Sequence, residues 1–139
     1  MPPQPKFVIF AHHATYDTLH QVATLGLTAA AMGKDVIVIL LFWTIKKLAE
    51  GKIDQVDFPP ENAASADEVM RLLKEKKVPK ISEMFQDAKH VGKFRLIACS
   101  AGLEYMGVDS AVIEKNVDEV MGLPAIIALI SDAETKLFI

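Results

Sequence analysis

The single cysteine of this 139-residue chain is the residue best suited to carry chemistry. Cys99 ends the apolar run 94–99 (FRLIAC), and the small residues Ser100, Ala101 and Gly102 follow it. This pattern predicts a buried strand, then a turn that opens a helix. Ligands and reactive groups of α/β sheets gather beyond the carboxyl ends of the strands. A thiolate there, beside a helix N-terminus, would be stabilised by free backbone N–H groups.

Two other predicted strands end in side chains that could assist this thiol. His12 and His13 come directly after the first apolar run of the chain, and Trp43 follows the second. In a parallel sheet these ends share one rim with Cys99. A histidine there could accept the thiol proton, and an apolar wall would keep water away from the sulfur. Because neighbouring residues of an extended segment point in opposite directions, we expect at most one histidine to face Cys99.

Each of these residues also has a simpler interpretation. Free cysteine is among the most buried residue types, so Cys99 is alternatively a small core residue. The adjacent histidines are alternatively a solvated loop pair, and Trp43 a packing residue. Both interpretations stay open on the sequence alone.

The composition narrows the class of protein. A net charge of −3 argues against a nucleic-acid partner held by counterion release. The apolar fraction of 51% predicts that some apolar surface is buried between subunits, so we expect a homo-oligomer. Residues 1–5 lack the features of a signal peptide, and the apolar run 36–43 is far shorter than the roughly 20 residues that span a bilayer. We therefore expect a cytoplasmic protein without a membrane span.

Strand and helix patterns alternate along the whole chain. This alternation predicts one α/β domain over 1–139, a three-layer α/β/α sandwich with a mainly parallel sheet of about five strands. Residues 1–5 are expected to form a flexible lead-in, and 52–66 a surface loop or lid. The expected strands are 6–11, 35–42, 94–99, 116–120 and 135–139, the fourth of them near a sheet edge. The expected helices are 17–32, 43–50, 67–77, 81–91, 100–106 and 124–130.

Other known motifs are absent from the sequence. It contains no GxxxxGK[ST] or GxGxxG phosphate loop, no GxSxG nucleophile motif and no CxxC pair. The spacing of the four histidines matches no standard zinc site. We therefore expect neither a cofactor nor a metal.

Four segments, spread over nearly the whole chain, share a pattern with a known family. They are 6–11 leading to Asp17, 29–36 running on through 42–43, 97–108 (IACSAGLEYMGV) and the terminal 137–139. On these segments the chain resembles the DsrE/DsrF-like family, specifically its DsrE2-type branch, which is often labelled peroxiredoxin-like. The segment with the cysteine is the most specific. It departs from the branch pattern at Ala101 and Leu103, where methionine is usual, and at Glu104, where aspartate is usual.

The resemblance implies a three-layer α/β fold, a homo-oligomer and a cysteine that carries sulfur as a persulfide. Cys99 would accept sulfane sulfur from a donor, either a protein or a small compound. With no second cysteine in the chain, it would pass that sulfur to a partner thiol. This describes a sulfur relay rather than a turnover enzyme. The candidate residues around the thiol are His12, His13, Trp43, Ser100, Gly102 and Glu104.

The alternative function is a non-catalytic module of the same fold. Such a module would bind a small ligand or assemble a complex, and its cysteine would be structural. A thiol peroxidase is a third, weaker interpretation, because no resolving cysteine exists within the chain.

Overall fold

A five-stranded, fully parallel sheet forms the centre of the computed structural model, which describes residues 2–139. Met1, the first residue of the predicted lead-in, lies outside this range. The strand order is β4-β3-β2-β1-β5. The strands are β1 (Lys6–Ala11), β2 (Asp35–Leu40), β3 (Lys93–Cys99), β4 (Glu119–Met121) and β5 (Thr135–Phe138).

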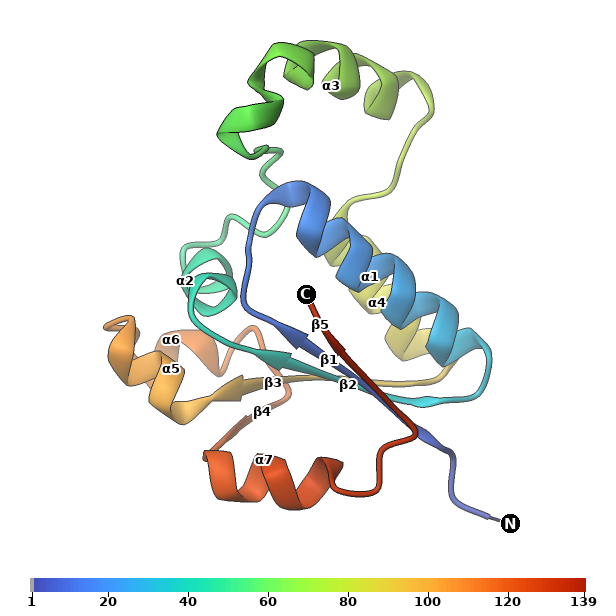
Figure 1. The fold of residues 1–139 in the computed structure, drawn as a ribbon, viewed down its shortest axis with the longest axis vertical. Coiled ribbons are helices and arrows are strands. Elements are labelled where there is room, and N and C mark those ends of the chain that lie inside the picture. The colour runs from blue at the N-terminus through green and yellow to red at the C-terminus, as the bar shows by residue number, and fades with distance from the viewer. Residues whose placement is uncertain (1) are drawn as a thin grey trace.

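Helices cover both faces of the sheet, so the predicted three-layer α/β/α sandwich is confirmed (Figure 1). The long helices α1 (Tyr16–Ala31) and α4 (Ile81–Val91) pack on one face, and α7 (Leu123–Ile130) lies alone on the other. The short helices α2 (Trp43–Ala49), α5 (Ser100–Tyr105) and α6 (Ser110–Ile113) lie beyond the carboxyl ends of β2 and β3. A 3-10 helix, η1 (Pro60–Ser65), and α3 (Ala66–Glu75) project away from the sheet and contain no buried residue.

The core divides into two apolar clusters because side chains alternate along each strand. On β3, Phe94, Leu96 and Ala98 join the larger cluster under α1 and α4. Ile97 and Cys99 join the smaller cluster under α7. The central strand β2 (DVIVIL) is apolar on both faces, as expected for an internal strand covered on each side.

Several predicted boundaries shift, and each shift has a local cause. Helix α1 begins at Tyr16 after the N-cap Thr15, one residue before the start of the expected range 17–32. The carboxylate of Asp57 accepts the Tyr16 N–H at 2.7 Å, so a residue far along the chain caps this helix. Strand β2 ends at Leu40, two residues before the predicted end, because the chain turns sharply at Phe42.

The fourth strand also differs from its prediction. It covers Glu119–Met121 rather than 116–120, although it lies at a sheet edge as expected. Asp118 sets its start, because its backbone N–H and its carboxylate both pair with the backbone of Leu96. The helix α6 and the 3-10 helix η1 were not predicted, and η1 occupies part of the expected loop 52–66.

Candidate functional site

The thiol of Cys99 is enclosed at the end of β3. Its residue is 2% exposed and packs in the cluster under α7. The other buried members of that cluster are all aliphatic: Val8, Ile37, Ile39, Ile97, Ile126 and Ile130. Cys99 is paired with Met121 across the β3–β4 register. The sulfur therefore sits in an apolar environment, with almost no surface open to a second reactant.

The helix that follows Cys99 carries three of the predicted site residues. Ser100 and Glu104 are exposed on α5, whereas Gly102 is buried. A Cβ atom at Gly102 would lie 2.6 Å from Cδ1 of Ile45. The missing side chain of Gly102 therefore allows α5 to pack closely against α2. Its role in the structure is packing beside the cysteine segment.

The parallel sheet brings the predicted strand ends to one rim, as the sequence indicated. His12 is half-buried, His13 is exposed, and their ring centroids lie 4.0 Å apart. Trp43 begins α2 and is 56% exposed. His13 and Trp43 line one pocket, which Cys99 and His12 do not line. The structure thus brings His13 and Trp43 together and places the thiol apart from them, on the α7 side of the sheet.

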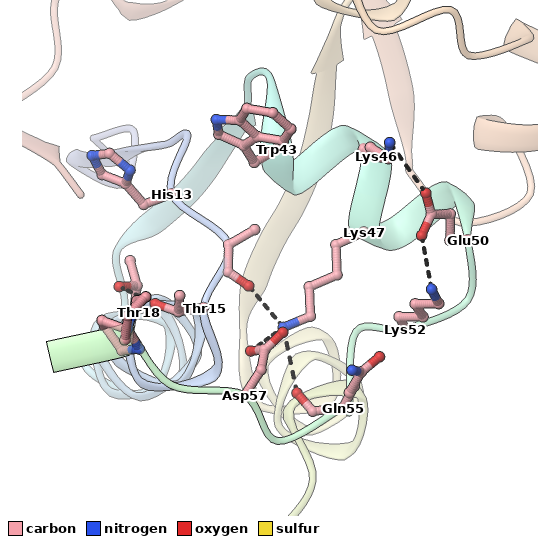
Figure 2. Close-up of a pocket in the computed structure, with 13 residues that line it drawn as sticks. His13, Thr15, Thr18, Trp43, Lys46, Lys47, Glu50, Lys52, Gln55 and Asp57 are labelled. Carbon is pink, nitrogen blue, oxygen red and sulfur yellow. Dashed lines mark hydrogen bonds and ion pairs between the residues drawn. The ribbon is translucent and has the colours of Figure 1, made fainter. Parts of the chain in front are cut away.

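This pocket lies at the carboxyl edge of the sheet and has a volume of about 600 Å³. Its walls come from three segments: residues 13–18, helix α2, and residues 50–60. Figure 2 shows His13 and Trp43 on one side, and Glu50 between Lys46 and Lys52 on another. A volume of this size is typical of sites for small organic ligands, which occupy roughly 300–1,000 Å³.

Lys47 joins the three walls of the pocket. It is 7% exposed, and its Nζ donates to the Ala14 carbonyl at 2.7 Å, the Gln55 carbonyl at 3.3 Å and Asp57 Oδ1 at 2.8 Å (Figure 2). These contacts satisfy all three protons of a buried ammonium group. Because Asp57 Oδ1 also accepts the Tyr16 N–H, one ion pair fixes α2, the 50–60 segment and the start of α1 together.

Lys47 was not among the residues predicted from the sequence. A weak signal was present, since Lys47 follows Thr44 by three residues and therefore lies on the same side of α2. Thr44 is buried, with its hydroxyl 2.8 Å from the Ala11 carbonyl oxygen. The carbonyl partners of Lys47 come from loops, which a helical pattern does not reveal.

Phe42 turns the chain from β2 into α2 with a backbone conformation rare for a bulky residue. Its φ is 47° and its ψ −110°. Such a conformation is strained for a side chain with a Cβ, and strained residues cluster at functional sites. The hydroxyl of Thr44 holds the turn by accepting the Leu41 N–H at 3.1 Å. After this turn, the consecutive residues Phe42 and Trp43 are both exposed at the carboxyl edge of the sheet.

The residues described by the structure show neither a metal centre nor a membrane span. They include no group of three or more His, Cys, Asp or Glu side chains placed to hold a metal ion. None of their helices has the length and apolar character needed to cross a bilayer.

Comparisons with known proteins bear on the fold alone. No family model matches this chain, and no curated protein matches it. Among solved structures, it is similar to a conserved protein of unknown function from Bacteroides thetaiotaomicron. That match has a TM-score of 0.61 at 16% identity, and it covers 97% of this chain and 95% of the other. The two chains therefore share a fold over almost their whole lengths.

Proposed function

We propose that this protein is a sulfur carrier in which Cys99 holds sulfane sulfur as a persulfide. The observation that carries the proposal is the position of the lone cysteine, between the carboxyl end of β3 and the start of α5. Reactive groups of parallel α/β sheets collect at this edge. The resemblance of segment 97–108 to DsrE2-type proteins supports the same role.

The transfer balances without an added oxidant or reductant. The Cys99 thiolate attacks the outer sulfur of a donor persulfide and forms a new S–S bond. The S–S bond of the donor breaks, and the donor leaves as a thiolate with the electron pair. In the second step a partner thiolate attacks the outer sulfur on Cys99 and restores the Cys99 thiolate. The partner is required because the chain has no second cysteine.

The burial of Cys99 means that this chemistry requires a local opening. The edge strand β4 is only three residues long and pairs with β3 on one side only. Met121, paired with Cys99, is half-buried, and Gly122 follows it at the start of α7. Short edge segments of this kind open at low free energy. We place the opening at the β4–α7 junction.

Intact mass spectrometry tests the proposal. Wild-type protein treated with polysulfide should gain the mass of one or more sulfur atoms, which dithiothreitol then removes. A Cys99→Ala variant should gain none. Sulfur addition that persists in the variant, or its absence in the wild type, would contradict the proposal.

The burial of Cys99 favours a second candidate function. In it, the protein is a non-catalytic module that binds a small ligand or assembles a complex, and Cys99 is a core residue. This candidate predicts that iodoacetamide labels Cys99 at least about a hundredfold more slowly in the folded protein than in urea. The sulfur carrier predicts labelling by iodoacetamide and loading by polysulfide on the same residue in the native state.

We also propose that the protein is a homo-oligomer of the reducing cytoplasm without a nucleic-acid partner. The support for self-association is α7, whose sequence LPAIIALI contains no polar side chain. A helix that is apolar on all sides is normally buried. In this chain Ile126 and Ile130 face the sheet, whereas Leu123 and Ile127 are exposed on the outer side. A second copy seated on α7 would cover that side.

A further inference from the structure

The pocket beneath Trp43 has the features of a built binding site, independent of the thiol. Most of its lining comes from α2 and from segment 50–60, and the walls are fixed to one another by the ion pair between buried Lys47 and half-buried Asp57. A site whose walls are fixed before the ligand arrives loses little entropy on binding. The Lys47 ammonium itself is fully used by its three acceptors, so it positions the pocket instead of binding a ligand.

The charge of the pocket is opposite to that of the whole protein. Three lysines line it (Lys46, Lys47 and Lys52) against two carboxylates (Glu50 and Asp57), which leaves 3 − 2 = +1. The complete chain carries −3. Asp57 is engaged by Lys47, and Glu50 is shared between Lys46 at 3.8 Å and Lys52 at 3.2 Å.

The two remaining lysines keep donors available for a ligand. In the part of the chain that the structure describes, Glu50 is the only charged partner of Lys46 and of Lys52. An ammonium group has three donors, so a single shared carboxylate leaves donors on both half-exposed groups that face solvent. An anionic group bound beside Glu50 would accept from these remaining donors.

Beside Lys46, the lining of the pocket is aromatic. Trp43 is more than half exposed, and no aromatic pair among residues 2–139 includes its indole. His13 lines the same side (Figure 2). An open indole face stacks against planar rings. We propose that this pocket binds a small aromatic carboxylate, with its ring against Trp43 and its carboxylate at Lys46 and Lys52.

This inference names a ligand class for the second candidate function and requires no chemistry at Cys99. The two can therefore fail separately. Sulfur loading of Cys99 by polysulfide would contradict the structural-cysteine candidate and leave binding at Trp43 intact. Absence of ligand binding would leave the sulfur-loading result unchanged.

Trp43 is the only tryptophan in the chain, so its fluorescence reports directly on this pocket. We would titrate the protein with benzoate, benzyl alcohol and cyclohexanecarboxylate, and confirm each affinity by calorimetry. Benzoate combines the ring and the charge. It should bind about tenfold more tightly than benzyl alcohol, the factor that one added charge-assisted contact supplies. It should bind about fivefold more tightly than cyclohexanecarboxylate, the factor that stacking on an aromatic ring supplies. Equal affinity for benzoate and benzyl alcohol would overturn the proposed carboxylate contact. Equal affinity for benzoate and cyclohexanecarboxylate would overturn the stacking on Trp43.

Variants locate the binding. Lys52→Met should weaken benzoate binding about fivefold, the effect of one exposed ion pair, and leave benzyl alcohol unchanged. Lys76→Met removes the same charge on an exposed residue that does not line the pocket, and should change neither affinity. An equal loss in both variants, or no saturable benzoate binding by calorimetry, would overturn the proposal. Circular dichroism of each variant verifies that it is folded.

Discussion

Lys47 Nζ and Asp57 Oδ1 lie 2.8 Å apart, in an ion pair whose lysine is buried and whose aspartate is partly open to solvent. Asp57 also caps the first turn of α1 through the Tyr16 N–H. The pair therefore links α2 and the segment 50–60 that follows it to the start of α1, which is distant in sequence. A lysine that is buried with all its donors satisfied is stabilising only while its partners remain in place.

Replacing this lysine should destabilise the fold measurably. We expect Lys47→Met to lower the free energy of unfolding by about 2 kcal/mol, less than the roughly 3–5 kcal/mol for breaking a fully buried pair, because water partly screens Asp57. Urea denaturation followed by circular dichroism measures the loss. Arg71→Met, in the exposed pair with Glu75, is the matched control and should change stability by less than about 0.5 kcal/mol.

A double-mutant cycle separates the pair from its surroundings. Asp57→Asn keeps an oxygen that can accept the Tyr16 N–H, but it leaves the buried Lys47 ammonium without its counter-charge. It should therefore cost at least as much as Lys47→Met. The double variant should be more stable than the sum of the single effects predicts, by about 1 kcal/mol. Strict additivity would show that Lys47 and Asp57 act independently.

The aliphatic surroundings of Cys99 lead to a second prediction. Cys99→Ser places a hydroxyl in a cluster without polar side chains, and should cost about 1–3 kcal/mol of stability. Cys99→Ala leaves only a small void and should cost less than the serine variant. Thermal or urea unfolding of both variants decides the order. If serine were tolerated better than alanine, the site would be hydrated, and the thiol would be more accessible than the structure indicates.

The sheet could be predicted from sequence because its strands carry local signals. The run 36–40 is apolar on both faces, and Gly33, in a left-handed conformation at φ 84°, ends the helix before it. The predicted range of the edge strand β4 was wrong because its start depends on the pairing of Asp118 with the Leu96 backbone, a tertiary interaction that no local pattern reveals. Likewise, the start of α1 depends on Asp57, which no local pattern in residues 15–18 encodes.

The site was only partly predictable. The predicted parallel pairing correctly placed His13, Trp43 and Cys99 at the same edge of the sheet, where β1, β2 and β3 end. The two-residue period also indicates that Cys99 shares the face of Ile97 and not that of Ala98. The sequence did not indicate which face would hold a pocket. That depended on segment 50–60 folding over α2, and on an ion pair between residues ten positions apart.

Two glycines permit close packing around the sheet, and they should differ in their tolerance of alanine. At Gly92 a Cβ atom would lie 2.5 Å from the Ala30 carbonyl oxygen, which is backbone within α1. At Gly102 the only contact closer than ordinary van der Waals distance would be with the flexible end of Ile45. We expect Gly92→Ala to cost about 2 kcal/mol and Gly102→Ala less than about 1 kcal/mol, as the backbone cannot yield as a side chain can. Denaturant midpoints compare them, and a reversed order would contradict the packing described.

The outer face of α7 offers a test of self-association. Ile127→Lys introduces a charge on an exposed apolar position and should leave the stability of a monomer almost unchanged. In an oligomer joined through α7 it should raise the dissociation constant by at least about tenfold, because a lysine would be desolvated at the interface. Analytical ultracentrifugation over a range of concentrations measures this. Met32→Lys is the control, because Met32 is exposed at the end of α1, away from α7, and this variant should leave the dissociation constant unchanged. Ala133 near α7 packs on the core and cannot serve this purpose.

Tyr16 should titrate above the ordinary tyrosine range. Its pKa is raised by burial, and to a smaller degree by the carboxylate of Asp54. The chain has two tyrosines, so a Tyr105→Phe variant leaves Tyr16 as the only phenol whose absorbance changes with pH. We expect a midpoint above the usual value of about 10. Asp54→Asn should lower this midpoint without restoring the usual value, because burial is the larger cause.

The raised pKa of Tyr16 means that, as the pH rises, the unfolded chain loses this proton before the folded protein does. The contribution of Tyr16 to stability is then complete below about pH 10 and is lost as the pH rises through the folded-state pKa. Circular dichroism recorded alongside the absorbance separates titration of the native state from unfolding, and a native-state midpoint at or below 10 would contradict the burial of Tyr16.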